Sequence, residues 1–268
     1  MSVDKNEIFK FFAKYIEKEL GIVYADHNYF QLQSRLEDMA RFQNLPGIEE
    51  VYKDALKGLD HKFQQYLLDL ATNNETSFFR DLKVFKAIQE VLEKRIPQKK
   101  TPYRIWSAAA SSGQEALSIA MILSEIGQTN YQILATDVSD RILEKAKSGV
   151  YTQLEIQRGL PAPMLIKYFT KDENDLWRAN PPLQKNISYK KMNLLEPLSF
   201  NEPFDMILCR NMLIYQSIER KKEILTKLTR SLTPDGVLVL GAGETLIGLS
   251  DECSQLPVKE AILYQRAA

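Results

Sequence analysis

The sequence has few of the residues from which disulfide-rich and zinc-binding folds are built. Its 268 residues include only two cysteines, Cys209 and Cys253, and two histidines, His27 and His61. With no CxxC pair and no Cys/His cluster, the pattern argues against both a disulfide framework and a metal site. So few cysteines in a chain of this length indicate a reducing compartment, and we expect a cytoplasmic protein.

The sequence also lacks an excess of charge and any long apolar run. Lys and Arg total 35 and Asp and Glu total 35, which leaves no electrostatic signature of nucleic-acid binding. No apolar run approaches the roughly 18 residues that a membrane-spanning helix needs. The N-terminal residues also lack the apolar stretch of a signal peptide. We therefore expect no nucleic-acid partner and no membrane insertion.

Residues 1–72 show helical patterns and no strand pattern. Apolar side chains recur at helical spacing in successive groups, and Pro46-Gly47 and Gly58 punctuate them. The spacing predicts an all-helical N-terminal domain, with stripes at Ile8, Phe12, Tyr15 and Ile16; Tyr29, Leu32, Leu36 and Met39; Ile48, Val51, Ala55 and Leu59; and Phe63, Leu67 and Leu70.

Residues 73–100 are predicted to form a long connecting helix. Asn74 or Thr76 would cap it, because a side-chain oxygen there would accept N–H bonds of the first turn. The helix should end before Pro97. Its apolar stripe would comprise Phe79, Leu82, Phe85, Ile88 and Leu92.

Residues 101–268 alternate between strand and helix, which is typical of a parallel sheet with crossover helices. Residues from about 160 to 190 interrupt this alternation, and we interpret them as an inserted antiparallel β-subdomain with short segments at Tyr168–Thr170, Leu176–Ala179 and Ile187–Lys190. The fold class is therefore α/β. The other predicted strands are Tyr103–Trp106, Tyr131–Thr136, Phe204–Cys209, Val237–Gly241 and Val258–Gln265, and the helices are Gly113–Leu123 and Ile218–Leu232.

A turn of small residues follows the first of these strands, with the sequence SAAASSG from Ser107 to Gly113. Small side chains let a ligand approach the backbone closely, as in nucleotide-binding strand–turn–helix units. The same composition also suits a tight turn in which small residues serve only packing. The turn is not GxGxxG, so it does not indicate a dinucleotide pyrophosphate.

Asp137 ends the second strand, where an acidic side chain can accept hydrogen bonds from both hydroxyls of a ribose. An Asp here could equally cap the helix that begins near Ser139, and the two roles are compatible. Together, the small-residue turn and this acid favour a nucleoside cofactor.

Arg210 and Asn211 follow the strand Phe204–Cys209 and would lie beside the same pocket. They could also simply satisfy backbone groups of a loop. Cys209 at a strand end is more typical of a small core residue than of a nucleophile. Neither histidine lies in this part of the chain, so a nucleophile would have no visible base.

The string NNETSFFRD, residues 73–81, is a dense cluster of polar and aromatic residues. A helix cap and ordinary packing explain Asn74 and the two phenylalanines. They do not explain Arg80, because a cation in the first turn of a helix opposes the helix dipole. Arg80 therefore suggests a partner that carries negative charge.

Four strings in this order, NNETSFFRD, IWSAAASSGQEALSIAM, ILATDVS and LCRNMLIY, resemble the CheR family of chemoreceptor glutamate methyltransferases. The first and last are highly specific, and the similarity extends over nearly the whole chain. The resemblance implies a helical N-terminal domain (1–72), a connecting helix that contributes to the active site (73–100), and a doubly wound, Rossmann-like methyltransferase domain (101–268) that carries the β-subdomain.

The resemblance further implies an enzyme that transfers methyl groups from S-adenosylmethionine to glutamate side chains of chemoreceptor methylation helices, leaving S-adenosylhomocysteine. Arg80 and Tyr215 would face the reacting centre as catalytic residues, and Asn211 would lie near the cofactor. Residues that match the cofactor-contacting positions of the family are Asn74, Thr76, Arg80, Glu115, Asp137, Asn193, Leu194 and Arg210.

Two segments depart from the family pattern. The second N-terminal helix, Arg-rich in the family, here keeps Arg35 and Arg41 but inserts Glu37 and Asp38. The β-subdomain turn within 168–177 is short and has no glycine, unlike the longer Gly-rich turn of members that bind a receptor's C-terminal pentapeptide. We therefore expect no pentapeptide tether.

Two other functions remain compatible with the residues themselves. The chain could be an S-adenosylmethionine-dependent methyltransferase that acts on another substrate, or a non-catalytic signalling module that binds the cofactor. Neutral net charge argues against a nucleic-acid substrate, and a large helical N-terminal domain suits a protein substrate. The presence of both Arg80 and Tyr215 argues for an enzyme.

Overall fold

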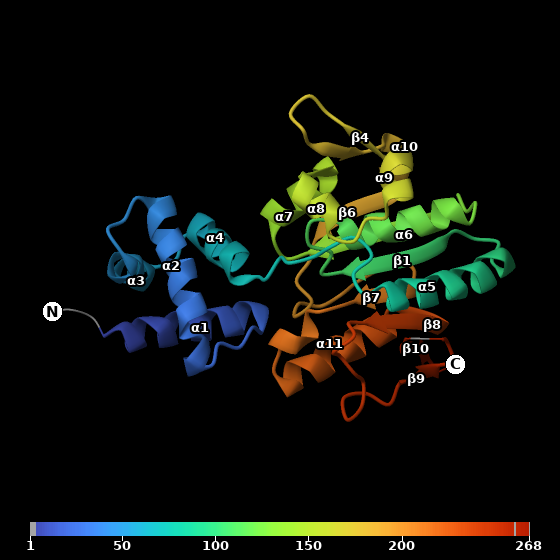
Figure 1. Cartoon of the computed structure of the whole chain (residues 1–268). Helices are drawn as coiled ribbons and strands as arrows, with labels where there is room; N and C mark the ends of the chain where they lie inside the picture. The colour runs from blue at the N-terminus through green and yellow to red at the C-terminus, as the bar shows by residue number, and fades with distance from the viewer. Residues whose placement is uncertain (1–3, 260, 268) are drawn as a thin grey trace. The chain divides into compact units, whose positions relative to one another are not determined.

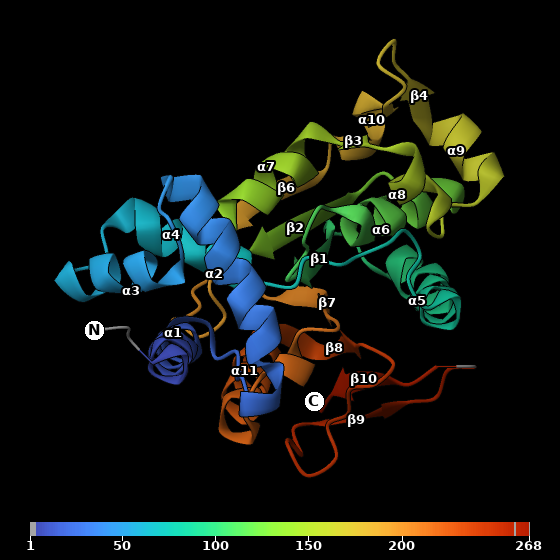
Figure 2. The same cartoon turned by 60° about the vertical axis from the view of Figure 1, so that its left-hand side comes forward.

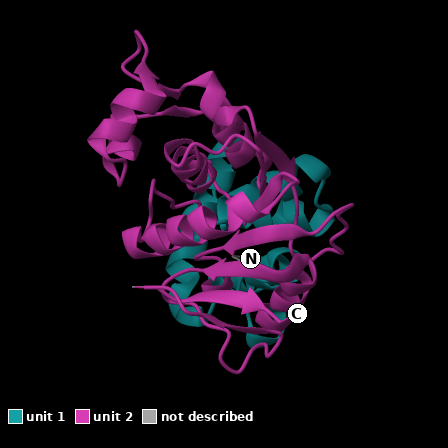
Figure 3. Cartoon of the chain, turned by 90° about the vertical axis from the view of Figure 1, so that its right-hand side faces the viewer, with its two compact units in different colours: residues 1–73, 215–220 teal, residues 74–214, 221–268 magenta. Residues whose placement is uncertain are grey.

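The computed structural model describes residues 4–259 and 261–267, which divide into two compact units (Figure 3). The first unit comprises residues 1–73 and 215–220, and the second comprises 74–214 and 221–268. The expected N-terminal domain did not include the second segment of the first unit. Over the described ranges, no helix is long and apolar enough to cross a membrane.

The first unit is built from helices, as the apolar spacing predicted (Figure 1). Helix α1 begins after Asp4, whose side chain accepts the Asn6 N–H, and it ends at Gly21 with the left-handed φ of 70°. Asp60 caps α4 in the same way by accepting the Phe63 N–H. The helices are α1 (Lys5–Leu20), the 3-10 turn η1 (Asp26–Asn28), α2 (Tyr29–Gln43), α3 (Ile48–Lys57) and α4 (His61–Ala71).

The second unit contains a seven-stranded sheet in the order β6-β2-β1-β7-β8-β10-β9 (Figure 2). The first five strands in this order are parallel, and the last two pair antiparallel at one edge. The parallel α/β sheet predicted from the alternation is confirmed, as is the doubly wound fold that the family resemblance implied. The strands are β1 (Tyr103–Ala108), β2 (Tyr131–Asp137), β6 (Ile187–Lys191), β7 (Phe204–Cys209), β8 (Leu232–Leu240), β9 (Cys253–Leu256) and β10 (Leu263–Arg266).

Alternating side chains of the strands fill a separate core on each face of this sheet. Ile105 of β1 packs with residues of α5 (Leu82–Arg95) and α6 (Gln114–Glu125). Trp106, the next residue, packs on the opposite face with α11 (Ile218–Arg230). Helices on both faces explain why the central strands are almost continuously apolar.

The β-subdomain differs in one strand from the prediction. The small antiparallel sheet has the order β3-β5-β4, from β3 (Val150–Tyr151), β4 (Phe169–Lys171) and β5 (Trp177–Ala179). The segment predicted at Ile187–Lys190 is instead β6, which pairs parallel with β2 in the main sheet. Short helices α8 (Gln153–Gln157), α9 (Ala162–Tyr168) and α10 (Pro181–Gln184) were not predicted.

The connecting helix begins later than predicted, so neither Asn74 nor Thr76 caps it. Helix α5 starts at Leu82, after Phe79 and Asp81 adopt left-handed φ angles of 49° and 63°. These two residues break the helical hydrogen-bond pattern, and residues 74–81 form an irregular segment. Leu82 is 58% exposed and does not belong to the apolar stripe. The helix ends before the 3-10 turn η2 (Ile96–Gln98), as expected near Pro97.

The backbone of this irregular segment passes close to Gly159 of the second unit. It has a φ of +97°, and a Cβ built there would lie 2.1 Å from the Phe78 carbonyl oxygen. Phe78 is fully buried against the rings of Tyr151 and Phe169. A side chain at position 159 would therefore have to displace the backbone of Phe78.

We predict that Gly159→Ala destabilises the protein much more than Gly127→Ala. Both glycines have left-handed φ angles, so each substitution should cost roughly 1–2 kcal/mol of conformational strain. At Gly127 nothing lies within 4 Å of the added Cβ, whereas at Gly159 the clash should add roughly 1–3 kcal/mol. Urea denaturation measures the difference, and equal losses in the two variants would show that the contact with Phe78 carries no strain.

Candidate active site

The strand order marks the point beside β1 where ligands of this fold class bind. The chain proceeds from β1 to β2 on one side and later crosses to β7 on the other side, so the strand order reverses between β1 and β7. Ligands of open α/β sheets bind at such a point, beyond the carboxyl ends of the strands. The strand ends here are Ala108 and Cys209, directly before the two motifs predicted to carry the site.

The turn after β1 is held in an unusual backbone conformation. Ala109, Ser111 and Gly113 all have left-handed φ angles, of 65°, 50° and 89°. The Ala110 N–H donates to the Thr136 carbonyl at 2.8 Å, which ties the turn to β2. A Cβ at Gly113 would lie 3.0 Å from Cβ of Ala146, so packing also requires glycine there. Both explanations offered for this turn, close packing and an accessible backbone, are thus compatible with its geometry.

Ser111 brings together two of the predicted cofactor residues. Its N–H donates to Oδ2 of Asp137 at 2.9 Å, and its hydroxyl donates to the Asn74 carbonyl at 2.8 Å. The other Asp137 oxygen accepts the Ser139 N–H at 3.1 Å, while Ser139 itself caps α7 (Asp140–Ser148). Asp137 is therefore not the cap of this helix, and its carboxylate orients both the turn and the chain after β2.

Arg210 is buried at the end of β7 among two other predicted site residues. Its side chain is 3% exposed, and Nη1 donates to Glu115 at 3.2 Å. Nη2 donates to the Arg80 carbonyl at 2.7 Å and to Asp81 at 2.8 Å. The guanidinium also lies over the Phe85 ring, 5.4 Å from its centroid. Arg210 therefore joins β7, α6 and the segment before α5.

In the Arg210 cluster the guanidinium and Glu115 are buried and paired, Asp81 is 36% exposed, and Arg210 Nε has no hydrogen-bond partner among the described residues. Glu115 accepts the Ser107 hydroxyl with its other oxygen at 2.7 Å, so the carboxylate is bonded on both sides. Removing one partner of a buried ion pair typically costs roughly 3–5 kcal/mol, because the other charge stays buried and unpaired. Glu115 and Arg210 thus shape the second unit in addition to any contact with a ligand.

Arg80 does not lie in the first turn of a helix, so the prediction that placed it there is wrong. It precedes α5, and its guanidinium donates to the Glu75 carbonyl at 3.1 Å. Glu75 in turn pairs with Arg158 at 2.6 Å. The helix-dipole argument for an anionic partner therefore does not apply. Thr76 lies in the same irregular segment and is partly buried.

The remaining predicted cofactor residues follow the other strands. Asn193 and Leu194 come just after β6, and the Asn193 side chain accepts the Leu195 N–H at 3.0 Å. Leu194 is buried. Asn211 follows Arg210 with a left-handed φ of 58°, and its N–H donates to Glu244 at 2.8 Å. All of these residues lie in the second unit, at the carboxyl edge of the parallel strands.

Cys209 is a core residue, as predicted, and is unsuited to nucleophilic chemistry. It is fully buried, and this burial raises the pKa of its thiol well above the usual value, with Glu244 and Glu115 adding to the effect. A thiol that stays protonated is a poor nucleophile. Within the described part of the chain, no group of His, Cys, Asp or Glu side chains is arranged to hold a metal ion.

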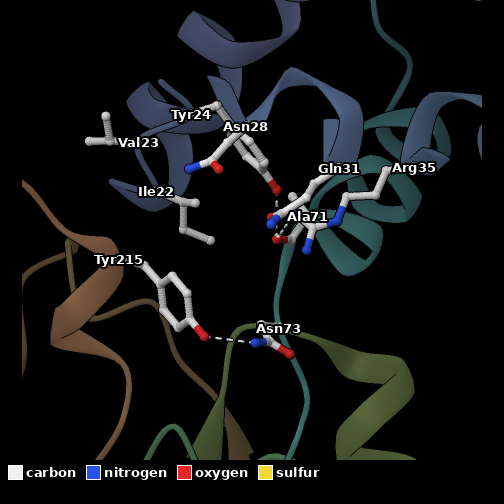
Figure 4. A pocket seen from close by; sticks show the side chains of 9 residues that line it. All are labelled: Ile22, Val23, Tyr24, Asn28, Gln31, Arg35, Ala71, Asn73 and Tyr215. Carbon is white, nitrogen blue, oxygen red and sulfur yellow. Dashed lines mark hydrogen bonds between the residues drawn. The ribbon is translucent and has the colours of Figure 1, made fainter. Parts of the chain in front are cut away.

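Tyr215 belongs to the first unit and lines a pocket there of about 140 Å³ (Figure 4). Its hydroxyl accepts a hydrogen bond from Nδ2 of Asn73 at 2.7 Å. Arg35 lines the same pocket and donates to the Ala71 carbonyl at 2.9 Å. Polar groups therefore surround the phenol within its own unit.

Three residues that shape these sites were not predicted from the sequence. They are Asp81, which lies in the NNETSFFRD string, Ser107, which was expected only to be small, and Glu244. Glu244 accepts the N–H groups of Asn211, Ile214 and Gly241 at 2.8, 3.2 and 2.7 Å, and so closes the turn after β7. Its position shortly after β8 was the available signal, because acidic residues at strand ends often bind backbone N–H groups.

A family model and several known relatives match this chain, and they agree on one family. Residues 74–262 match the model of the CheR methyltransferase, SAM binding domain. The chain is 34% identical to a chemotaxis protein methyltransferase of Vibrio parahaemolyticus over 95% of this chain and 94% of that protein. It is 34% identical to chemotaxis protein methyltransferase 1 of Pseudomonas aeruginosa, with 97% and 98% covered. The chemotaxis protein methyltransferase of Escherichia coli is 33% identical, with 88% and 83% covered.

The family model spans the whole segment that contains the strand-order reversal between β1 and β7, the Arg210 cluster and Asp137. The relatives extend the similarity through the helical first unit. The chain therefore belongs to the CheR methyltransferase family and is an S-adenosylmethionine-dependent methyltransferase.

Proposed function

We propose that this enzyme methylates glutamate side chains of chemoreceptors and so forms glutamate methyl esters for chemotactic adaptation. The observation that carries the proposal is the 34% identity, over nearly the full length of both chains, to proteins named chemotaxis protein methyltransferase. Identity over the first unit as well as the cofactor domain favours a shared substrate, because the family model for cofactor binding begins only at residue 74.

The residues of the second unit fit S-adenosylmethionine. The small side chains after β1 leave the backbone open to close approach by a ligand. Each oxygen of a carboxylate can accept more than one hydrogen bond, so the bonds from Ser111 and Ser139 leave Asp137 compatible with ribose hydroxyls. We propose Asn74, Thr76, Arg80, Glu115, Asp137, Asn193, Leu194, Arg210 and Asn211 as the residues that surround the cofactor.

Methyl transfer to a carboxylate needs little general acid–base catalysis by the protein. When bound, S-adenosylmethionine would supply a methyl group on a positively charged sulfur, and transfer of that methyl group to a carboxylate oxygen would break the carbon–sulfur bond and leave an ester and a neutral thioether. A glutamate carboxyl has a reference pKa near 4.3, so at neutral pH the nucleophile is already ionised and no base is needed. The residues therefore have to align the reacting atoms and exclude water.

Arg80 and Tyr215 are the residues we propose for this alignment. Arg80 would hold the substrate carboxylate by a charge-assisted hydrogen bond, since the bond to the Glu75 carbonyl uses only one of its five N–H donors. The Tyr215 hydroxyl would donate a second bond that orients it. Contacts that gripped the carboxylate too tightly would weaken it as a nucleophile, so we expect positioning bonds rather than a closed bidentate clamp.

Asp137→Ala should weaken binding of S-adenosylhomocysteine by about ten-fold or more. Losing a charged acceptor should cost roughly 1.5–3 kcal/mol. The matched control is Asp140→Ala, three residues on, which removes an exposed ion pair with Lys191. Isothermal titration calorimetry without added metal measures both variants. Unchanged affinity in a folded Asp137→Ala protein would remove this residue from the site.

Arg80→Ala should abolish most turnover, and Tyr215→Phe should slow methyl transfer by about five- to a hundred-fold. Neither side chain is part of a buried apolar core, so thermal melts should show both proteins folded. The assay is single-turnover methylation of receptor-containing membranes at saturating cofactor. Cofactor affinity should change less in Tyr215→Phe than in Asp137→Ala. A wild-type rate in Tyr215→Phe would show that the hydroxyl has no role in the reaction.

The turn between β4 and β5 should not bind a receptor C-terminal pentapeptide. Only residues 172–176 join the strands, and the Asp172 side chain closes the turn by accepting the Asn174 and Leu176 N–H groups at 2.9 and 3.0 Å. Calorimetry with a pentapeptide that ends in aromatic residues should show no heat of binding. Micromolar affinity would refute this expectation and restore tethering.

A further inference from the structure

The pocket of the first unit holds the proposed catalytic phenol in a defined hydrogen bond. The Asn73 amide nitrogen lies 2.7 Å from the Tyr215 oxygen, and Figure 4 shows the two side chains meeting end to end. We propose that Asn73 is a positioning residue for methyl transfer: it donates to the Tyr215 oxygen and leaves the phenol proton directed to the substrate carboxylate. This inference rests on the function proposed above.

The donors and acceptors of the Asn73 amide, the Tyr215 phenol and the substrate carboxylate determine which group donates in each of the two hydrogen bonds. The amide nitrogen of Asn73 is a donor only, and an ionised carboxylate is an acceptor only. A phenol has one proton to give and oxygen lone pairs that accept. With Asn73 donating to the oxygen, the phenol proton serves a second partner. Successive hydrogen bonds of this kind also polarise one another, so the amide makes the phenol a better donor.

Both partners are held by backbone bonds within the first unit. The Tyr215 carbonyl accepts the Val23 N–H at 3.1 Å, and the next residue, Gln216, forms an antiparallel bridge with Ile22. Asn73 follows the end of α4, where the Thr72 N–H donates to Leu68 and the Thr72 hydroxyl donates to Asp69. The Asn73–Tyr215 bond therefore joins two anchored segments that are 142 positions apart in the sequence.

Arg35 and Tyr24, two other polar residues of the pocket, donate to a backbone carbonyl and not to the phenol. Arg35 and the Tyr24 hydroxyl both donate to the Ala71 carbonyl, at 2.9 and 3.2 Å. The Arg35 guanidinium also lies over the Tyr24 ring, 5.3 Å from its centroid. These bonds order the wall of the pocket, and the Asn73 amide is the group that meets the phenol.

A double-mutant cycle tests the coupling between Asn73 and Tyr215. Asn73→Ala should slow single-turnover methylation by roughly three- to ten-fold and leave S-adenosylhomocysteine affinity within about two-fold of wild type. In a Tyr215→Phe background, Asn73→Ala should change the rate by less than about two-fold, because the oxygen it orients is absent. Equal rate effects of Asn73→Ala in both backgrounds would overturn the proposal.

Asn73→Asp provides a sharper substitution of nearly the same shape. Its carboxylate accepts instead of donating, so it should capture the phenol proton and slow the reaction more than Asn73→Ala does. A rate for Asn73→Asp equal to that of wild type would contradict the proposed direction of the bond. Thermal melts of the variants report whether the fold is intact.

A spectroscopic measurement tests the bond without any substrate. In protein labelled with carbon-13 at the tyrosine Cζ position, the Tyr215 resonance is the one missing from Tyr215→Phe. It should shift in Asn73→Ala and shift further in the same sense in Asn73→Asp, because both variants lose the amide donor and the carboxylate also accepts the phenol proton. An unmoved resonance would refute the hydrogen bond. If wild-type protein failed to methylate receptors while the resonance moved as expected, the proposed substrate would be wrong and the bond would stand.

Discussion

The guanidinium of Arg210 is the contact on which the geometry of the second unit's site depends. It is almost fully buried at the end of β7 and donates to Glu115 on α6, to Asp81 and to the Arg80 carbonyl. These bonds hold the irregular segment 74–81 against the sheet, while Ser111 bonds the same segment through the Asn74 carbonyl. A buried cation needs such partners to offset its desolvation, so the site's polar residues are also its structural supports.

Periodicity predicted most of the fold because the sheet has a buried core on each face. Strands β1, β2 and β7 lie where the apolar runs placed them, to within two residues. The segment 187–191 was assigned to the wrong sheet, because its sequence does not specify which strand it pairs with. The start of α5 was misplaced because non-glycine residues, Phe79 and Asp81, adopt left-handed backbone angles that the sequence does not signal.

The positions of the candidate site residues at strand ends were predicted, and the contacts between them were not. Strand ends are local features, so the motifs around Asp137 and Arg210 could be found from the sequence. The pairing of Arg210 with Glu115 joins residues 95 positions apart, and that of Asn73 with Tyr215 joins residues 142 apart. Such pairs follow from tertiary packing, which one sequence without relatives cannot reveal. Glu244 differs from these pairs, because its place shortly after β8 is a local feature, although one of the N–H groups that it accepts belongs to Asn211, 33 positions away.

The proposed methyl acceptor is a glutamate carboxylate of a chemoreceptor. The direct measurement is transfer of tritiated methyl groups from S-adenosylmethionine to receptor-containing membranes, followed by mild alkali. Because methyl esters hydrolyse to volatile methanol, base should release the tritium that is bound to the receptor. The bound tritium should also be lost when the receptor's methylated glutamates are replaced by alanine. Base-stable counts, or no transfer to any receptor despite tight cofactor binding, would contradict this proposal.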